Sequence, residues 1–140
     1  MKTNKEAARR VIEYIEANLD KEIDLDAISK AVGYSKYHLN RMFTEETGCT
    51  ICKYLQLRRL TVAAQQLIES DKAIAQIAYE MGYHSQQAFT LAFKQLYLCP
   101  PKAYRDRGIY IPKQKKLILQ LQSRTQIKRF NMMGARRDAA

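Results

Sequence analysis

The stretch GYHSQQAFTLAF (residues 82–93) follows the same pattern as an earlier stretch, GYSKYHLNRMF (residues 33–43). Both begin with Gly-Tyr, continue through a serine and several polar residues, and close on a phenylalanine. The residues in front of them, 25–33 and 74–82, also align at an offset of 49, which becomes 50 after one inserted residue. Each copy therefore predicts a short helix, a tight turn at glycine and a second helix, which is the helix-turn-helix pattern.

Apolar spacing and helix-capping residues predict seven helices and no strand before residue 109. The side chains placed to cap helix N-termini are Asp24, Ser35, Thr50 and Ser85. The expected helices cover about residues 5–19, 25–31, 36–47, 51–69, 74–81 and 86–96, with a short last helix from Pro101. We therefore predict an all-α domain over residues 1–108, in which helix-turn-helix subdomains at about 8–48 and 73–107 are joined by a long linker helix over 51–69.

Composition bounds the class of protein. With 140 residues, 46% of them apolar, the chain can bury the core of one ordinary domain. No apolar run approaches the roughly 18 residues that span a bilayer, and the N-terminus lacks the apolar core of a signal peptide. We therefore expect a soluble, cytoplasmic protein with no membrane partner.

The net charge of +10 favours a polyanionic partner, but it is unevenly placed. Residues 1–108 carry a net charge of +3, whereas residues 109–140 carry +7. This C-terminal segment includes KLILQLQ at residues 116–122, a short apolar run that could form a strand. We leave three interpretations of the segment open: a DNA-touching arm, a solvated basic tail, or the start of an effector domain.

The second helix of each repeat pairs an apolar stripe with a polar face. We expect Leu39, Met42 and Phe43 to be buried in the first copy, and Phe89, Ala92, Phe93 and Leu96 in the second. An arginine on the polar face can bind guanine in a bidentate manner, an asparagine or glutamine can bind adenine, and a tyrosine ring can pack on a thymine methyl. The candidate base-contacting residues are Lys36, Tyr37, Asn40 and Arg41 in the first copy, and Gln86, Gln87, Thr90 and Leu91 in the second.

Phosphate contacts are expected from helix N-termini and from basic side chains beside a groove. The candidates are Ser35, Thr50, Lys53, Arg58, Ser85, Lys94, Lys102 and Arg105. Each of these residues also has a simpler interpretation as a helix cap or a solvated surface charge. Tyr54 and Tyr104, which match at the offset of 50, are expected to be packing residues.

Catalytic and metal chemistry find little support in the sequence. Cys49 and Cys52 form a CxxC motif, but a thioredoxin-like site would need a preceding strand, and a zinc site would need two more ligands at suitable spacing. Metalloprotease, serine-hydrolase and phosphate-loop motifs are absent from the sequence. We therefore expect no enzyme activity, no metal and no cofactor.

Several segments together resemble the AraC/XylS family of bacterial transcription regulators, and its MarA/SoxS/Rob-like branch in particular. The segments are GYSKYHLNRMFTEETG, YLQLRRLTVAAQQL, IAQIAYEMGYHSQQAFTLAFKQL and PPKAYR, and the resemblance covers about residues 8–107. It implies sequence-specific binding to double-stranded DNA by one chain, with both recognition helices in successive major grooves. The linker of 19 residues would span about 28 Å, close to the roughly 34 Å of one DNA turn.

The second copy departs from the family pattern at two positions. Leu91 stands where many members have arginine, and Leu98 stands where many have glycine. Because leucine cannot donate a hydrogen bond to guanine, we expect the first recognition helix to dominate and the half-site of the second to be A·T-rich and more tolerant of base changes.

The alternative function is a helical protein-interaction module that recruits RNA polymerase or another regulator. Salt dependence separates the two hypotheses, because phosphate contacts weaken steeply with added salt.

Overall fold

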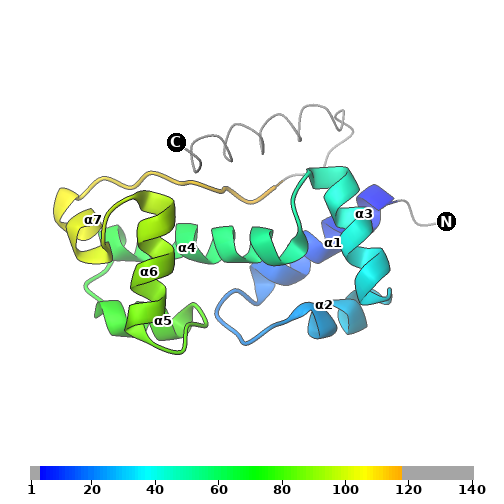
Figure 1. Cartoon of the computed structure of the whole chain (residues 1–140), viewed down its shortest axis with the longest axis horizontal. Helices are drawn as coiled ribbons and strands as arrows, with labels where there is room; N and C mark the ends of the chain where they lie inside the picture. The colour runs from blue at the N-terminus through cyan, green and yellow to red at the C-terminus, as the bar shows by residue number, and fades with distance from the viewer. Residues whose placement is uncertain (1–3, 118–140) are drawn as a thin grey trace. The chain divides into compact units, whose positions relative to one another are not determined.

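The structure, a computed structural model, describes residues 4–117 and confirms the predicted all-α class. Over this range the chain forms seven helices and no strand (Figure 1). The helices are α1 (Asn4–Ala17), α2 (Leu25–Val32), α3 (Lys36–Thr47), α4 (Ile51–Glu69), α5 (Ile74–Glu80), α6 (Gln86–Tyr97) and α7 (Pro101–Arg107). Most of the possible strand at residues 116–122, and the basic segment after it, lie outside the described residues.

The described residues pack into two compact units, each of which contains one copy of the repeat. The first unit comprises residues 4–19, 23–55 and 116–117, and the second comprises residues 20–22 and 56–115. Helix α4 contributes its first residues, up to Leu55, to the first unit and its remaining residues to the second.

Side-chain capping fixes where four of the helices begin, as the sequence predicted. The Asp24 Oδ1 accepts a hydrogen bond from the Ala27 N–H at 2.9 Å, at the start of α2. Ser35, Thr50 and Ser85 cap α3, α4 and α6 through their hydroxyl oxygens, each accepting from the N–H three residues ahead. Such caps satisfy backbone donors that have no partner within a helix and are worth roughly 1 kcal/mol each.

The core of the first unit forms where α1 packs against α2 and α3, and where α2 packs against α3 (Figure 1). Its fully buried side chains include Ala7, Val11, Ile12, Ile15, Ile28, Leu39 and Phe43. Tyr54, at the start of α4, joins this core: its ring lies 5.7 Å from that of Phe43, and its hydroxyl accepts a hydrogen bond from the Leu117 N–H at 3.1 Å. The predicted packing role of Tyr54 is therefore confirmed.

The core of the second unit centres on Phe93 of α6, which is fully buried. Its ring contacts those of Phe89, Tyr97 and Tyr104 at centroid distances of 5.6, 4.6 and 5.4 Å. The Tyr104 hydroxyl accepts a hydrogen bond from the Ile111 N–H at 2.7 Å, much as Tyr54 does in the first unit. Burial, with a smaller effect of the neighbouring Tyr104, raises the pKa of Tyr97.

Residues 109–117 continue past the predicted domain end at residue 108 and make specific contacts. In the second unit, the Gln114 N–H donates to the Thr61 hydroxyl at 3.0 Å, and Gln114 is buried. In the first unit, Lys116 Nζ pairs with Glu13 at 3.0 Å. This part of the predicted tail is therefore packed against the helical units.

Leu98 ends α6 in the left-handed conformation, with φ of +64°. It is the only residue other than glycine with positive φ in the described range, and the matched residue at the end of α3 is Gly48. A side chain in this conformation costs about 1–2 kcal/mol. Leu98 is 69% exposed, so contacts of its side chain offset little of that cost.

We expect Leu98→Gly to raise the free energy of unfolding by about 0.5–1 kcal/mol, because relief of backbone strain exceeds the added chain entropy of glycine. Gly33→Ala is the matched control: Gly33 also has positive φ, and an added Cβ would meet no atom within 4 Å. The free energy of unfolding of Gly33→Ala should fall by about 1 kcal/mol. Urea denaturation measures both changes, and a destabilised Leu98→Gly protein would contradict the strain assigned to Leu98.

Candidate nucleic-acid interface

Helix α3 begins at the Ser35 cap and has a buried apolar side and an exposed polar side. Leu39, Met42 and Phe43 are buried, as predicted. Lys36, Tyr37 and Arg41 are exposed on the opposite side, with Tyr37 79% exposed. An exposed tyrosine ring beside two cations is suited to a groove that offers base edges and phosphates.

Lys36 forms an ion pair with Asp26 of α2, with Nζ and Oδ1 2.9 Å apart. The hydrogen bond to Asp26 raises the pKa of Lys36. The pair ties the start of α3 to the preceding helix of the motif. Because both side chains are more than half exposed, solvent screens the attraction, and Lys36 remains accessible to an anionic partner.

Arg41 is 66% exposed and pairs with Glu45, one helical turn further along α3. The Arg41 Nε donates to the Glu45 Oε1 at 3.3 Å. Sequence reasoning missed Glu45, although its i,i+4 spacing from an arginine is a recognisable signal.

Asn40 has a structural role that the sequence did not reveal. Its Oδ1 accepts a hydrogen bond from the Ile51 N–H at 3.1 Å, at the start of α4. A bidentate contact with adenine uses this same oxygen as acceptor. Because an amide oxygen has two lone pairs, it can accept both hydrogen bonds, and the adenine contact stays a prediction. In the second copy the residue matched to Ile51 is Pro101, which has no N–H, and Thr90 replaces Asn40.

Helix α6 presents a face of different chemistry. Gln86, Gln87 and Leu91 are exposed, whereas Thr90 is half-buried. Phe89, Phe93 and Leu96 form the buried stripe as predicted, with Ala92 half-buried beside them. Leu91, 62% exposed at the position matched to Arg41, gives this face an apolar surface in place of a cation.

The candidate phosphate contacts divide into two groups. Ser35, Thr50, Lys53, Ser85, Lys94 and Lys102 are all exposed, and three of them mark helix N-termini where backbone N–H groups favour anions. Arg58 and Arg105 differ, because the structure gives both guanidinium groups internal partners. The Arg58 Nη1 donates to the Gln114 carbonyl at 2.6 Å.

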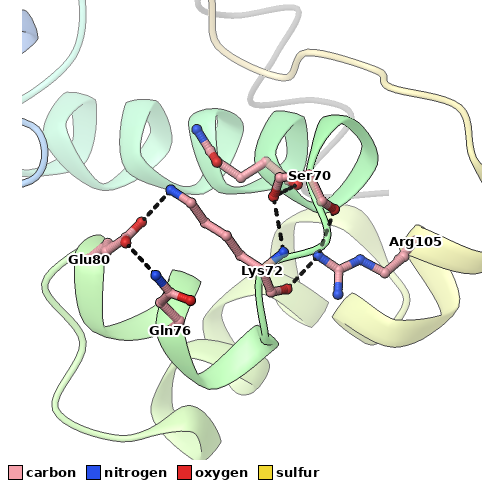
Figure 2. Close-up of polar contacts among 6 residues, drawn as sticks. Ser70, Lys72, Gln76, Glu80 and Arg105 are labelled. Atoms are coloured by element: carbon pink, nitrogen blue, oxygen red, sulfur yellow. Dashed lines mark hydrogen bonds and ion pairs between the residues drawn. The ribbon is translucent and has the colours of Figure 1, made fainter.

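Arg105 of α7 closes the C-terminal end of α4 (Figure 2). Its Nε donates to the Leu67 carbonyl at 2.8 Å, and its Nη2 donates to the carbonyls of Ser70 and Lys72 at 3.3 and 2.7 Å. The Leu67 carbonyl belongs to the last turn of α4, where carbonyls have no partner within the helix, and the other two lie in the loop that follows. Arg58 and Arg105 therefore have structural roles that the sequence did not reveal, and the phosphate contact proposed for each stays a prediction.

The loop that Arg105 holds is also tied to α5 (Figure 2). Lys72 Nζ lies 3.0 Å from the Glu80 Oε1, and Gln76 Nε2 donates to the other carboxylate oxygen at 3.1 Å. The hydrogen bond from Lys72 lowers the pKa of Glu80. This cluster connects α4, α5 and α7 and so supports the helix-turn-helix of the second unit.

The cysteines show no sign of a redox or metal centre within residues 4–117. All three are free thiols, and burial raises the pKa of Cys49, which makes its thiolate less available. Over the described range, no group of three or more His, Cys, Asp or Glu side chains is arranged to hold a metal ion. None of the described helices is long and apolar enough to cross a membrane.

Comparisons with known proteins agree on one group of relatives. Residues 28–107 match the family described as "Helix-turn-helix domain". The multiple antibiotic resistance protein MarA of Salmonella typhimurium is 41% identical over 100 residues, which is 71% of this chain and 79% of MarA.

Two solved structures share the fold. The crystal structure of a transcriptional regulator with an AraC-type DNA-binding domain from Chromobacterium violaceum is 27% identical, with a TM-score of 0.69 over 73% of this chain and 91% of that chain. The DNA-binding domain of AdpA, solved in complex with a target DNA, is 25% identical, with a TM-score of 0.66 over 72% of this chain and 90% of that chain.

We expect Arg105→Ala to lower the free energy of unfolding by about 2–3 kcal/mol, because three carbonyls lose a charged donor. Lys102→Ala, at an exposed position of the same helix, is the control and should change stability by less than about 0.5 kcal/mol. Thermal and urea denaturation measure both. Equal stability of the two variants would show that the Arg105 contacts contribute little to the fold.

Proposed function

Because this chain belongs to the AraC-type helix-turn-helix family of transcription regulators, we propose that it reads a specific double-stranded DNA site by placing α3 and α6 in successive major grooves. The observation that carries the proposal is the repeated construction. Each recognition helix begins at a serine cap, buries an apolar stripe that includes a phenylalanine and exposes its opposite face in the same register. The DNA-binding domain of AdpA, which was solved in complex with a target DNA, supports this use of the fold.

For α3 we propose that Arg41 contacts guanine and Tyr37 packs on a thymine methyl, with Lys36 at the nearby backbone. The exposure of all three side chains supports this assignment. For α6 we propose that Gln87 reads adenine and that Leu91 offers apolar contact to thymine methyls. An arginine–guanine contact is worth about 1–3 kcal/mol of discrimination, which Leu91 cannot supply. The second half-site should therefore be A·T-rich and the less strictly read of the two.

Phosphate contacts in this proposal come from the six exposed candidates. Each would position the helices without conveying base identity. We place the protein in the cytoplasm, where bacterial DNA is accessible, and we regard RNA polymerase as a further partner. DNA binding should weaken steeply as salt is added, whereas an apolar protein interface should not.

We further propose that one chain binds one site, because each chain carries two recognition helices. Analytical ultracentrifugation of the protein with a single-site duplex should give a 1:1 complex as the smallest specific species. A duplex with a scrambled site of equal length is the control for non-specific loading. A smallest specific complex with two chains per duplex would mean that each chain uses only one recognition helix.

Arg41→Ala should cost about 1–3 kcal/mol on the best site selected from a random DNA pool and should relax discrimination at one base pair. Lys102→Ala should weaken binding to all sequences alike and flatten the salt dependence. Titrations against a series of single-base variants of the site measure both effects. If Arg41→Ala lowers affinity for the selected site and for random duplex equally, Arg41 contacts phosphate and the assignment is wrong.

A further inference from the structure

We infer that Glu45 positions the guanidinium of Arg41 and thereby sets how strictly α3 selects guanine. The inference rests on the proposed function, because it assumes that Arg41 meets base edges. Glu45 lies one turn beyond Arg41 and two turns beyond Tyr37, so the three residues follow one side of α3.

Pairing with Glu45 leaves Arg41 with its terminal N–H donors for a base. The guanidinium carries five N–H donors, and the single Nε–H is given to the Glu45 Oε1 at 3.3 Å. The two terminal nitrogens remain for the O6 and N7 acceptors of guanine, which an arginine can bind in a bidentate manner. Glu45 therefore occupies the donor that such a contact does not need and limits the rotation of the group that makes it.

The negative charge of Glu45 also affects DNA binding. Glu45 is 46% exposed on the side of α3 proposed to meet DNA, where a carboxylate is repelled by phosphates. On random DNA, Arg41 would serve as a phosphate cation, and its pairing with Glu45 competes with that use. At the proper guanine, Arg41 keeps Glu45 and gains the base. The pair thus weakens non-specific binding more than specific binding, which is a route to specificity through repulsion.

The repeat offers an internal comparison. At the offset of 50, Leu91 and Gln95 take the places of Arg41 and Glu45. Both members of the charged pair are therefore replaced together on α6, by an exposed leucine and an exposed amide. Transferring the pair to α6 tests the inference in a second setting.

The experiment uses the full chain and duplexes that carry each of the four base pairs at the position read by Arg41, with random duplex alongside. Glu45→Ala should lower the preference for guanine about 3- to 5-fold, as expected for loss of an exposed ion pair, while affinity for random duplex rises. Glu45→Gln keeps a hydrogen-bond acceptor without the charge. It should retain more of the guanine preference than Glu45→Ala, but it should show the same rise on random duplex.

Glu69→Ala is the matched control, because Glu69 is an exposed glutamate at the end of α4 that accepts a hydrogen bond from Gln65 at 2.9 Å. It should leave base preference unchanged. Arg41→Ala distinguishes a failure of the proposed function of α3 from a failure of the inference about Glu45. If Arg41→Ala does not alter base preference, the proposed function of α3 fails. If Arg41→Ala removes guanine preference but Glu45→Ala leaves it intact, only the inference about Glu45 fails.

The transfer compares Leu91→Arg with the double variant Leu91→Arg, Gln95→Glu. Leu91→Arg alone should raise affinity for guanine-containing and random sites together, mostly through added charge. The double variant should prefer guanine about 3- to 5-fold more strongly than Leu91→Arg does. A double variant that loses affinity equally on all sequences would overturn the inference, because Gln95→Glu would then act only by cancelling a charge.

Discussion

A buried contact between a phenylalanine of each recognition helix and a tyrosine of the following helix holds each unit together. In the first unit the rings of Phe43 and Tyr54 lie 5.7 Å apart, and in the second those of Phe93 and Tyr104 lie 5.4 Å apart. Such pairs contribute more than their buried area alone. Because each phenylalanine lies on the inward side of its helix, the contact also determines which side of that helix faces solvent. The exposed polar faces proposed to read DNA are a consequence of this packing.

Several polar side chains that the sequence offered as DNA contacts have structural roles. Asn40 accepts from the first amide of α4, whereas in the second copy Pro101 removes the need for an acceptor. Arg105 donates to three carbonyls, so its guanidinium stabilises the end of α4 and the loop that follows it. Charge and position in sequence are therefore insufficient to assign a DNA contact, because the carbonyls at a helix end can accept hydrogen bonds from the same donor.

The two units share a backbone pattern and differ in the chemistry that they expose. The first presents a tyrosine and a guanidinium held by a carboxylate, and the second presents amides and an exposed leucine. The same copy also ends its recognition helix on Leu98 in a conformation that favours glycine. Both departures lie on the solvent side of α6 or at its end, where the aromatic core tolerates them. A fold built twice in this way can keep its architecture while the two helices expose different chemistry to solvent.

The sequence by itself determined the seven helices, most of their ends, the buried stripes and the repeat. These features depend on residues within about one helical turn of each other, such as Ser35 with the N–H three residues ahead, and local patterns record them directly. Only the tertiary structure revealed the internal contacts of Arg58, Arg105 and Asn40, and the packing of residues 109–117. The Arg58–Gln114 and Arg105–Leu67 contacts join residues 56 and 38 positions apart. No local pattern encodes such a contact, because the partner is a backbone carbonyl, which every residue possesses and whose place is fixed only when the helices pack.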